Sequence, residues 1–339
     1  MDVNVYISVV YGDLKSWFRP MICASGDLHR CYGGKFTRPL YPADLKVKFA
    51  AAMVSDRFAS MSQCPPVVLT IAGFDPSSGA GITADIKTIA AHGCYGVAAI
   101  TAMTVQSTQG VTRVEPVSLK LLRESLNALA ADVDISGIHI GMLGDGKVAA
   151  EVAAFLSEAK LPNVVLDTVL TSTSGARLLD DAGRKILTDK LLPLTTAITP
   201  NAQEASALTG LEVISVQDMQ RAAERLRGMG AQNVVVTGGH LEIATDLLLL
   251  ASGDVQTFKS ERLDSNCTHG TGCAFSSSIA CHLAQGRPLP ESVLLAKAYV
   301  TAAITNGYSI GKGTSPINHM YRMRNHPGGF ARKLASGRD

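Results

Sequence analysis

Five consecutive residues, H-G-T-G-C at 269–273, combine an imidazole, two glycines and a thiol directly before a run of small residues. The run at 274–285 has the pattern of a helix. Gly270 and Gly272 would then expose backbone N–H groups at a helix N-terminus, an arrangement that binds an anion such as a phosphoryl group. Cys273 would lie in the same first turn, where the helix dipole and nearby donors should lower the pKa of its thiol. We therefore interpret Cys273 as a candidate base or nucleophile; a small cysteine that only packs well is the alternative.

A second glycine-containing segment, G-F-D-P-S-S-G-A-G at 73–81, follows the first apolar run of the regular part of the chain. Its glycines allow the backbone to approach a ligand closely, and a helix that starts near Ala80 would turn free N–H groups toward the same place. A plain turn with Asp75 as a cap is an equally good interpretation of this segment alone. Neither G-x-x-x-x-G-K-[ST] nor G-x-G-x-x-G occurs in the chain, which weakens a P-loop or a Rossmann interpretation.

Two further segments carry side chains that could bind a ligand. Gln106 offers a donor and an acceptor together, as the edge of a heterocycle requires, although an exposed loop glutamine is the simpler interpretation. Asn201 and Glu204 stand three residues apart, which is the spacing of a helix capping box. The same pair could face phosphates or Mg²⁺, but spacing alone favours the cap.

Near-continuous apolar runs predict the strands of a parallel sheet that helices cover on both faces. These runs lie at 67–73, 96–105, 137–143, 163–169, 196–201 and 233–239. Helical patterns follow at 80–92, 119–131, 147–159, 202–209, 216–229, 272–285 and 290–306. The segment 247–263 has a Gly-Asp turn between two strand-like pieces and predicts an antiparallel hairpin at the sheet edge. The alternation indicates an α/β fold, in which ligands bind beyond the carboxyl ends of the strands.

The composition narrows the class of protein. Of the 339 residues, 46% are apolar and 18% are charged, which is ordinary for a globular protein. The seven cysteines form no C-x-x-C pair, so a zinc site is not indicated and a reduced, cytoplasmic setting is the simplest interpretation. The net charge of +2, with basic ends and a mildly acidic middle, gives no reason to expect nucleic acid. No apolar run is long enough to predict a membrane span.

The regular patterns divide the chain into three parts. Residues 1–63 have no continuous pattern and no secretory signal, so we expect a disordered or non-native extension, with Met61 as the natural start. The intact mass of natively expressed protein would test this start. A single domain is expected at 64–321, and residues 322–339 are expected to form a basic, flexible tail.

Taken together, the motifs resemble those of a known family. The segments TIAGFDPSSGAGITADIKT, TAMTVQSTQGV, IGML, VVLDTV, TPNAQEA and NCTHGTGCAFSSSIA, in this order, are similar to the hydroxymethylpyrimidine/phosphomethylpyrimidine kinases of thiamine biosynthesis. The resemblance covers about residues 64–320 and implies a ribokinase-like, three-layer α/β/α sandwich that works as a homodimer with ATP and Mg²⁺. The implied reaction adds phosphate to 4-amino-5-hydroxymethyl-2-methylpyrimidine and then a second phosphate to the monophosphate.

The same resemblance implies roles for residues at matching positions. The pyrimidine pocket is expected to contain Gly73, Ala80, Asp85, Thr104, Gln106 and Met142, with Gln106 bonding the amino and nitrogen edge of the ring. The anion hole is expected at Gly270, Thr271 and Gly272, and Cys273 is expected to accept the hydroxymethyl proton. The residues expected to serve ATP and Mg²⁺ are Asn201, Glu204, Asp167 and Thr237, with Asn201 and Glu204 as the metal-facing pair.

Three positions depart from the family pattern. Many members have glycine where Ser78 stands, so a positive φ at this position would strain the serine. Many members have lysine where Thr237 stands, and some have lysine at Thr173. Fewer positive charges would impair the second phosphorylation more than the first, because two phosphates then share the site.

Two other functions remain open from the sequence. A pyridoxal kinase would share the fold, although Gln106 together with Met142 favours the pyrimidine. A catalytically silent pyrimidine- or nucleotide-binding module is the alternative from a different class, and the intact H-G-T-G-C segment argues against it. Turnover of each alcohol would separate these possibilities.

Overall fold

The computed structural model describes residues 64–172, 174–239 and 244–324. The extension predicted at 1–63, Thr173 and residues 325–339 of the predicted tail lie outside the described residues. In chain order the elements are β1 (Val67–Phe74), α4 (Gly81–Ala91), β2 (Tyr95–Ser107), β3 (Gly110–Pro116), α5 (Leu119–Asp132), β4 (Ile135–Ile140), α6 (Gly146–Ala159), β5 (Val164–Leu166), α7 (Asp181–Ile186), a π turn (Leu187–Leu191), a 3-10 turn (Leu192–Leu194), β6 (Ala197–Ile198), α8 (Ala202–Thr209), α9 (Val216–Gly228), β7 (Val234–Val236), β8 (Ala244–Leu249), β9 (Val255–Ser260), β10 (Cys267–His269), α10 (Thr271–Ala284), α11 (Leu289–Thr305), β11 (Ser315–Pro316) and α12 (Tyr321–Arg324).

The central layer is a nine-stranded sheet in the order β3-β2-β1-β4-β5-β6-β7-β8-β9. The strands from β2 to β7 along this order are parallel, whereas β8 and β9 form an antiparallel hairpin at one edge. The predicted mostly parallel sheet with an antiparallel edge hairpin is therefore confirmed. At the opposite edge β3 also pairs antiparallel, with β2. The sequence did not predict β3, because its mixed polar and apolar residues form no apolar run.

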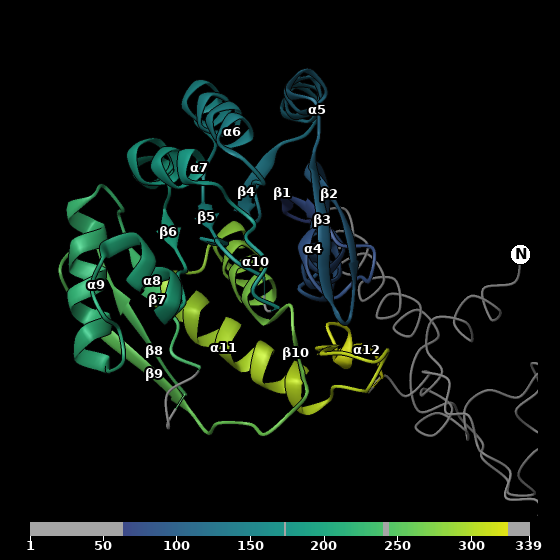
Figure 1. Cartoon of the computed structure of the whole chain (residues 1–339). Coiled ribbons are helices and arrows are strands. Elements are labelled where there is room, and N and C mark those ends of the chain that lie inside the picture. The colour runs from purple at the N-terminus through teal and green to yellow at the C-terminus, as the bar shows by residue number, and fades with distance from the viewer. Residues whose placement is uncertain (1–63, 173, 240–243, 325–339) are drawn as a thin grey trace, which may run out of the picture. The chain divides into compact units, whose positions relative to one another are not determined.

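Side-chain alternation along the strands builds a separate core on each face of the sheet. On one face Leu69 and Ile71 of β1 belong to a cluster with residues of α5, α6, α8 and α9. Val68, between them, belongs to the cluster with α4, α10 and α11 on the other face. Figure 1 shows the resulting helix–sheet–helix layers. The three-layer α/β/α arrangement is as expected.

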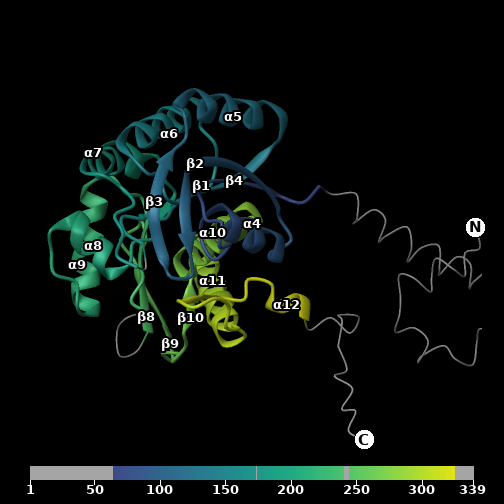
Figure 2. The same cartoon turned by 45° about the vertical axis from the view of Figure 1, so that its right-hand side comes forward.

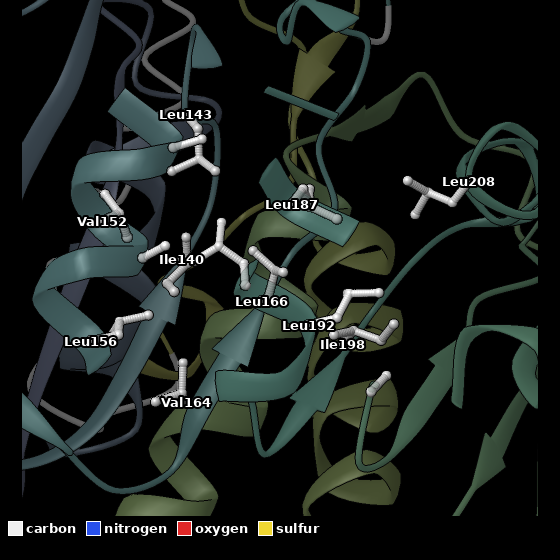
Figure 3. Close-up of a cluster of buried hydrophobic side chains, with 14 of the residues drawn as sticks. Ile140, Leu143, Val152, Leu156, Val164, Leu166, Leu187, Leu192, Ile198 and Leu208 are labelled. Carbon is white, nitrogen blue, oxygen red and sulfur yellow. The ribbon is translucent and has the colours of Figure 1, made fainter. Parts of the chain in front are cut away.

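The larger core cluster lies under α6 and the turns that follow α7 (Figure 3). Ile140, Leu166 and Ile198, from three adjacent strands, are fully buried there, and Leu187 of the π turn packs with them. Full burial of each such side chain contributes about 1.5–3 kcal/mol. This layer fixes the strands whose carboxyl ends carry the candidate site.

The strands β4 to β7 end earlier than the apolar runs predicted, whereas β1 and β2 end slightly later. β4, for example, ends at Ile140, whereas the run extended to residue 143. Several residues with expected roles follow directly after strands, namely Met142, Asp167, Asn201 and Thr237. Because β1 pairs with β2 on one side and β4 on the other, the connections leaving β1 and β4 diverge at this edge of the sheet.

Part of the predicted tail is helical. Helix α12 extends to Arg324, and the guanidinium of Arg322 lies 5.5 Å from the centre of the Tyr299 ring. This distance allows a cation–π contact that holds α12 against α11. In the described part of the chain, no helix has both the length and the apolar character needed to span a membrane.

Candidate active site

Helices α4 and α10 lie side by side, and their N-termini meet (Figure 2). Neither N-terminus is capped by a side chain, whereas α5, α6, α7, α8 and α9 each have a capping side chain. The first-turn N–H groups of α10 are therefore not taken up by a cap, whereas at α4 the N–H of Gly81 donates to Cys273. The N-terminus of α10 favours a negatively charged ligand.

The loop after β1 touches the H-G-T-G-C segment directly. A Cβ added to Gly270 would lie 1.9 Å from the carbonyl oxygen of Gly79, and Gly270 has a φ of +84°. A Cβ on Gly79 would lie 2.1 Å from Cδ2 of His269. Both glycines are thus needed for this close approach. The contact joins the expected anion hole to the loop of the expected pyrimidine pocket.

Asp75 organises the loop after β1. Its carboxylate accepts hydrogen bonds from the backbone N–H groups of Ser77, Gly79 and Ala80, and its Oδ2 lies 3.1 Å from Nε2 of His269. Burial would raise the pKa of Asp75, but the hydrogen bonds from His269, Ser77 and Ala80 lower it overall. Asp75 therefore caps the whole loop and joins it to β10.

The same loop contains Ser78, which has a φ of 63°. Its carbonyl oxygen accepts a hydrogen bond of 2.8 Å from Nζ of Lys87. The backbone of Ser78 is therefore in the left-handed region, where a residue with a side chain is strained, as the replacement of glycine at this position predicted. The loop tolerates the strain because Asp75 and Lys87 hold it on both sides.

Gln106 and Thr104 stand at the end of β2 beside His269. Nε2 of Gln106 lies 3.3 Å from Nε2 of His269, and Oε1 of Gln106 lies 3.2 Å from the hydroxyl of Thr104. A small cavity of about 60 Å³ is lined by Gln106, His269 and Thr314, among others. Two residues expected in the pyrimidine pocket therefore lie together, next to the H-G-T-G-C segment.

Gly73, Met142 and Ala80 surround the same loop. A Cβ on Gly73 would lie 3.0 Å from Sδ of Met142, so a larger residue would press on the methionine. Met142 is buried at the end of β4, and Ala80 is the half-buried N-cap of α4. The structure brings these three expected pocket residues close to the loop that Asp75 holds.

Asp85 does not join them. It is fully buried, its Oδ2 accepts from the hydroxyl of Thr70 (2.7 Å) and its Oδ1 accepts from that of Ser277 (2.8 Å). Both oxygens have protein partners and the side chain lies in the core, so a pocket role of Asp85 stays an expectation. The reason for this burial is helical geometry: one turn after Gly81, the side chain faces the sheet and α10.

Cys273 lies in the first turn of α10, against the first loop. The N–H of Gly81 donates to its sulfur, which also contacts the carboxylate of Asp167. Although part of the residue is exposed, burial raises the pKa of the thiol well above its ordinary value, and the charges of Asp167 and Asp85 raise it further. The expectation of a lowered thiol pKa is wrong, because desolvation and these carboxylates outweigh the helix dipole.

Asp167 lies between Cys273 and the core. Burial raises the pKa of Asp167 to about 6, although the charge of His139 and the hydrogen bonds from Ser276 and Cys273 oppose this rise. A Cβ on Gly272 would lie 3.6 Å from Oδ2 of Asp167, so the carboxylate lies below the first turn of α10. A carboxylate with this pKa can accept a proton at neutral pH.

Asn201, Glu204 and Thr237 form a second group, after β6 and β7. Glu204 N–H donates to Oδ1 of Asn201 (2.9 Å) and Asn201 N–H donates to Oε2 of Glu204 (3.0 Å), so the predicted capping box is confirmed. Thr237 N–H donates to the carbonyl of Pro200, which places Thr237 beside Asn201. Burial raises the pKa of Glu204 to about 8, and the charge of Asp167 adds to the rise.

A buried ion pair supports the segment that carries Thr237. Nζ of Lys297 lies 2.8 Å from Oδ2 of Asp246, and the other oxygen of Asp246 accepts from the N–H of Gly238 (3.1 Å). Within the described residues, no three His, Cys, Asp or Glu side chains are grouped closely enough to hold a metal ion. The two groups of site residues interact electrostatically, because the charge of Asp167 raises the pKa of Glu204.

Comparison with known proteins identifies the family. A family model described as phosphomethylpyrimidine kinase matches residues 75–318. The chain belongs to the phosphomethylpyrimidine kinase family. The hydroxymethylpyrimidine/phosphomethylpyrimidine kinase of Haemophilus influenzae is 44% identical to it over 257 residues, which are 74% of this chain and 96% of that protein. The protein of the same name from Bacillus subtilis is 39% identical over 260 residues, 76% of this chain and 96% of that protein.

Solved structures agree with the family assignment. A phosphomethylpyrimidine kinase from Clostridium difficile has 38% identity and a TM-score of 0.64, over 70% of this chain and 99% of that chain. An ADP complex of a Bacillus subtilis pyridoxal kinase has 34% identity and a TM-score of 0.71, over 77% of this chain and 100% of that chain. The resemblance seen in the sequence and the ribokinase-like fold are thus confirmed.

Three residues of this family member had no assigned role in the sequence analysis. His269 stands inside the H-G-T-G-C segment, and only its contact with Asp75 shows that it joins two loops. His139 and Ser276 lie behind Asp167 in the core. A histidine within the apolar run GIHIGML was the one signal in the sequence that pointed to this second group.

Proposed function

We propose that this chain transfers phosphate from ATP to 4-amino-5-hydroxymethyl-2-methylpyrimidine and then to the resulting monophosphate, the reactions for which its relatives are named. The observation that carries the proposal is the contact between two glycine loops beside Cys273 and Asp167. It places the uncapped N-terminus of α10, a polar pocket edge and proton acceptors within one small region.

The N-terminus of α10 supplies the anion site. Gly270, Thr271 and Gly272 would bind the transferring phosphate with their backbone N–H groups, assisted by the α10 dipole. Phosphoryl transfer depends mainly on positioning and on neutralising charge, and both come here from the backbone. The close contact of Gly270 with Gly79 keeps the anion site next to the pyrimidine loop.

The loop after β1 and the end of β2 supply the pyrimidine site. Gln106 can pair with the amino and nitrogen edge of the ring, and Thr104, whose hydroxyl lies 3.2 Å from the amide oxygen of Gln106, holds the amide in place. Gly73 and Met142 would border the ring. The hydroxymethyl group would then extend toward Cys273 on the neighbouring segment.

Cys273 and Asp167 act together as the proton acceptor. Because its pKa is raised, Cys273 is a thiol at neutral pH, and a thiol can accept a proton only as it gives up its own. Its hydrogen bond to Asp167 provides that route: the sulfur takes the hydroxymethyl proton while its own proton moves to the carboxylate. Asp167, with a pKa of about 6, is ionised and ready to receive it.

Mg²⁺ and the ATP phosphates fit the second group. Glu204 is a buried carboxylate whose cost of ionisation is raised by burial and by the charge of Asp167, so a divalent cation beside it would be stabilised. Oxygen ligands from Asn201 and Glu204 suit Mg²⁺, which supplies charge neutralisation for the phosphates. Thr237, beside Asn201, would contact the nucleotide.

The chain is proposed to act in the cytoplasm as a homodimer. Three large apolar side chains are exposed on one face of β2, Ile100, Met103 and Val105. An exposed apolar strand face of this kind fits a contact with a second copy. Light scattering of the purified chain would give twice the monomer mass if the dimer is correct and the monomer mass if it is not.

The direct test counts phosphates on the product. The wild-type chain is incubated with the hydroxymethylpyrimidine, excess ATP and Mg²⁺, and the product is analysed by mass, with pyridoxal in a parallel reaction. One and then two added phosphates support the proposal. Faster turnover of pyridoxal would favour a pyridoxal kinase, the name of one structural neighbour. Pyrimidine binding without any turnover would favour the silent binding module.

A further inference from the structure

A row of polar side chains continues from the candidate site into the core. Behind Asp167 it consists of Ser276, His139 and Asp85, none of which has any solvent exposure. Polar and charged groups buried in this way cost about 1–3 kcal/mol or more each unless they are paired. Each of them has a hydrogen-bond or ion-pair partner within the row.

Strand alternation sets the row on the α10 side of the sheet. His139 of β4 is the register partner of Thr70 of β1, and both lie on the face that α4 and α10 cover. Their neighbours Ile138 and Ile140 belong to the core of the opposite face. The imidazole is therefore held by two strands and two helices.

The inner end of the row is an ion pair. Nδ1 of His139 lies 3.2 Å from Oδ2 of Asp85, to which the hydroxyl of Thr70 also donates. Burial would lower the pKa of His139, but the charges of Asp85 and Asp167 and the hydrogen bond with Asp85 raise it overall. The ionisable groups that act on His139 are thus Asp85 on α4 and Asp167 after β5, while β1 and α10 contribute hydroxyl groups.

The outer end of the row reaches the proton acceptors. Nε2 of His139 lies 2.9 Å from Oγ of Ser276, and this Oγ lies 3.4 Å from Oδ2 of Asp167 and 2.9 Å from the carbonyl oxygen of Gly272. A hydroxyl group has one hydrogen to donate. When Nε2–H of His139 donates to Ser276, the hydroxyl hydrogen is free for Asp167 or for the carbonyl oxygens of Gly272 and Cys273, the latter at 3.2 Å. A ring without that N–H would take the hydrogen instead.

We propose that His139, fixed by Asp85, is a positioning residue for the kinase reaction: through the hydroxyl of Ser276 it orients Asp167 beside Cys273. This inference rests on the function proposed above and deepens it. It also gives the buried Asp85 a role in the core, where it holds the imidazole.

The test uses the hydroxyl link, which can be removed with little change in volume. Ser276→Ala breaks the contact between His139 and Asp167, and His139→Gln removes the positive charge while keeping a polar side chain. The matched control is Ser278→Ala on the same helix, because Oγ of Ser278 lies 2.9 Å from Nε2 of another buried histidine, His92, outside the row. Thermal unfolding of all variants shows which of them fold.

Ser276→Ala is expected to lower kcat for the hydroxymethylpyrimidine about tenfold, the equivalent of one lost hydrogen bond, and to change KM less than about twofold. The double variant with His139→Gln should be no slower than His139→Gln alone, because both changes break one connection. Equal kcat in Ser276→Ala and Ser278→Ala, or additive losses in the double variant, would overturn the inference.

A second readout does not depend on turnover. Alkylation of Cys273 by iodoacetamide at pH 8, followed on its own peptide by mass spectrometry, reports how the surroundings of the sulfur affect its reactivity. His139→Gln breaks the row that holds Asp167 beside the sulfur, so the alkylation rate should differ from wild type by about threefold or more, whereas Ser278→Ala should match wild type. An unchanged rate in His139→Gln contradicts the inference even if the wild type phosphorylates no pyrimidine, an outcome that would overturn the proposed function separately.

Discussion

Two aspartate–histidine pairs with similar distances occupy very different surroundings in this molecule. Asp75 and His269 are 3.1 Å apart where two loops meet, and their side chains keep 4% and 13% of their exposure. Asp85 and His139 are 3.2 Å apart in the core, and neither side chain has any exposure. The outer pair joins segments that must come together around a ligand. The inner pair cannot touch a ligand.

An aspartate–histidine pair therefore has a different role in each of the two places. Breaking the outer pair loosens the first loop from β10, which should weaken substrate binding. Breaking the inner pair leaves an uncompensated charge in the core, and its remaining effect passes through Ser276 to Asp167. We therefore expect the outer pair to affect KM and the inner pair to affect stability and kcat.

The largest difference should appear in stability. Asp85→Ala removes the partner of a buried histidine and should lower the free energy of unfolding by about 3–5 kcal/mol. Asp75→Ala removes hydrogen bonds at a partly accessible loop and should cost about 1–2 kcal/mol. Urea unfolding of both variants measures the difference. Equal losses would show that burial does not distinguish the two pairs.

Disrupting the contact between Gly270 and Gly79, beside the outer pair, should have the next largest effect, on kcat/KM. Gly270→Ala places a methyl group 1.9 Å from the carbonyl oxygen of Gly79, so the two loops must separate. We expect kcat/KM to fall at least about 100-fold, which corresponds to about 2.7 kcal/mol of transition-state stabilisation. Gly286→Ala is the control, since Gly286 also has a positive φ, of +80°, but has no atom within 4 Å of an added Cβ. Similar activity of the two variants would contradict the contact.

His269→Gln tests the outer pair itself. The variant loses the contact with Asp75 while a polar side chain remains, so KM for the pyrimidine should rise about tenfold, the equivalent of one lost hydrogen bond. Its kcat should stay within about threefold of wild type. Steady-state kinetics at saturating ATP measures both parameters. A loss in kcat with unchanged KM would assign His269 to the inner, positioning role instead.

Glu204 shows what a buried carboxylate does without a histidine partner. Its pKa of about 8 in the folded chain lies above its ordinary value of 4.5. Between these values the unfolded chain has released the proton that the folded chain keeps, so stability falls as pH rises, by at most about 1.4 kcal/mol per pH unit. Glu204→Gln should flatten this fall in unfolding measurements from pH 5 to pH 8. An unchanged slope would mean that Glu204 is not the group that titrates.

The sequence predicted the layers of the fold because fully buried parallel strands appear in it as near-continuous apolar runs. It overestimated how far β4 to β7 extend, since residues just beyond them, such as Met142, are also apolar or buried. It missed β3, whose pairing with β2 depends on a register that no local pattern records.

For the site, the motifs predicted which residue types take part, but not the surroundings of each side chain. The H-G-T-G-C segment indicated an anion site, but the pKa of Cys273 depends on Asp167 and Asp85, which are more than 100 positions away. Asp85 was placed in the pocket because it lies in a family motif, and only its position on α4 shows that it faces the sheet. Long-range burial, rather than local sequence, decides these points.

The most direct measurement compares wild type with Cys273→Ala in ATP-dependent phosphorylation of the hydroxymethylpyrimidine, with pyrimidine binding measured by calorimetry on the same samples. Loss of a positioned proton acceptor should lower kcat at least about 100-fold, while the dissociation constant of the pyrimidine stays within about threefold. Equal turnover by the two proteins would contradict the account, because the sulfur at the start of α10 would then have no part in the reaction.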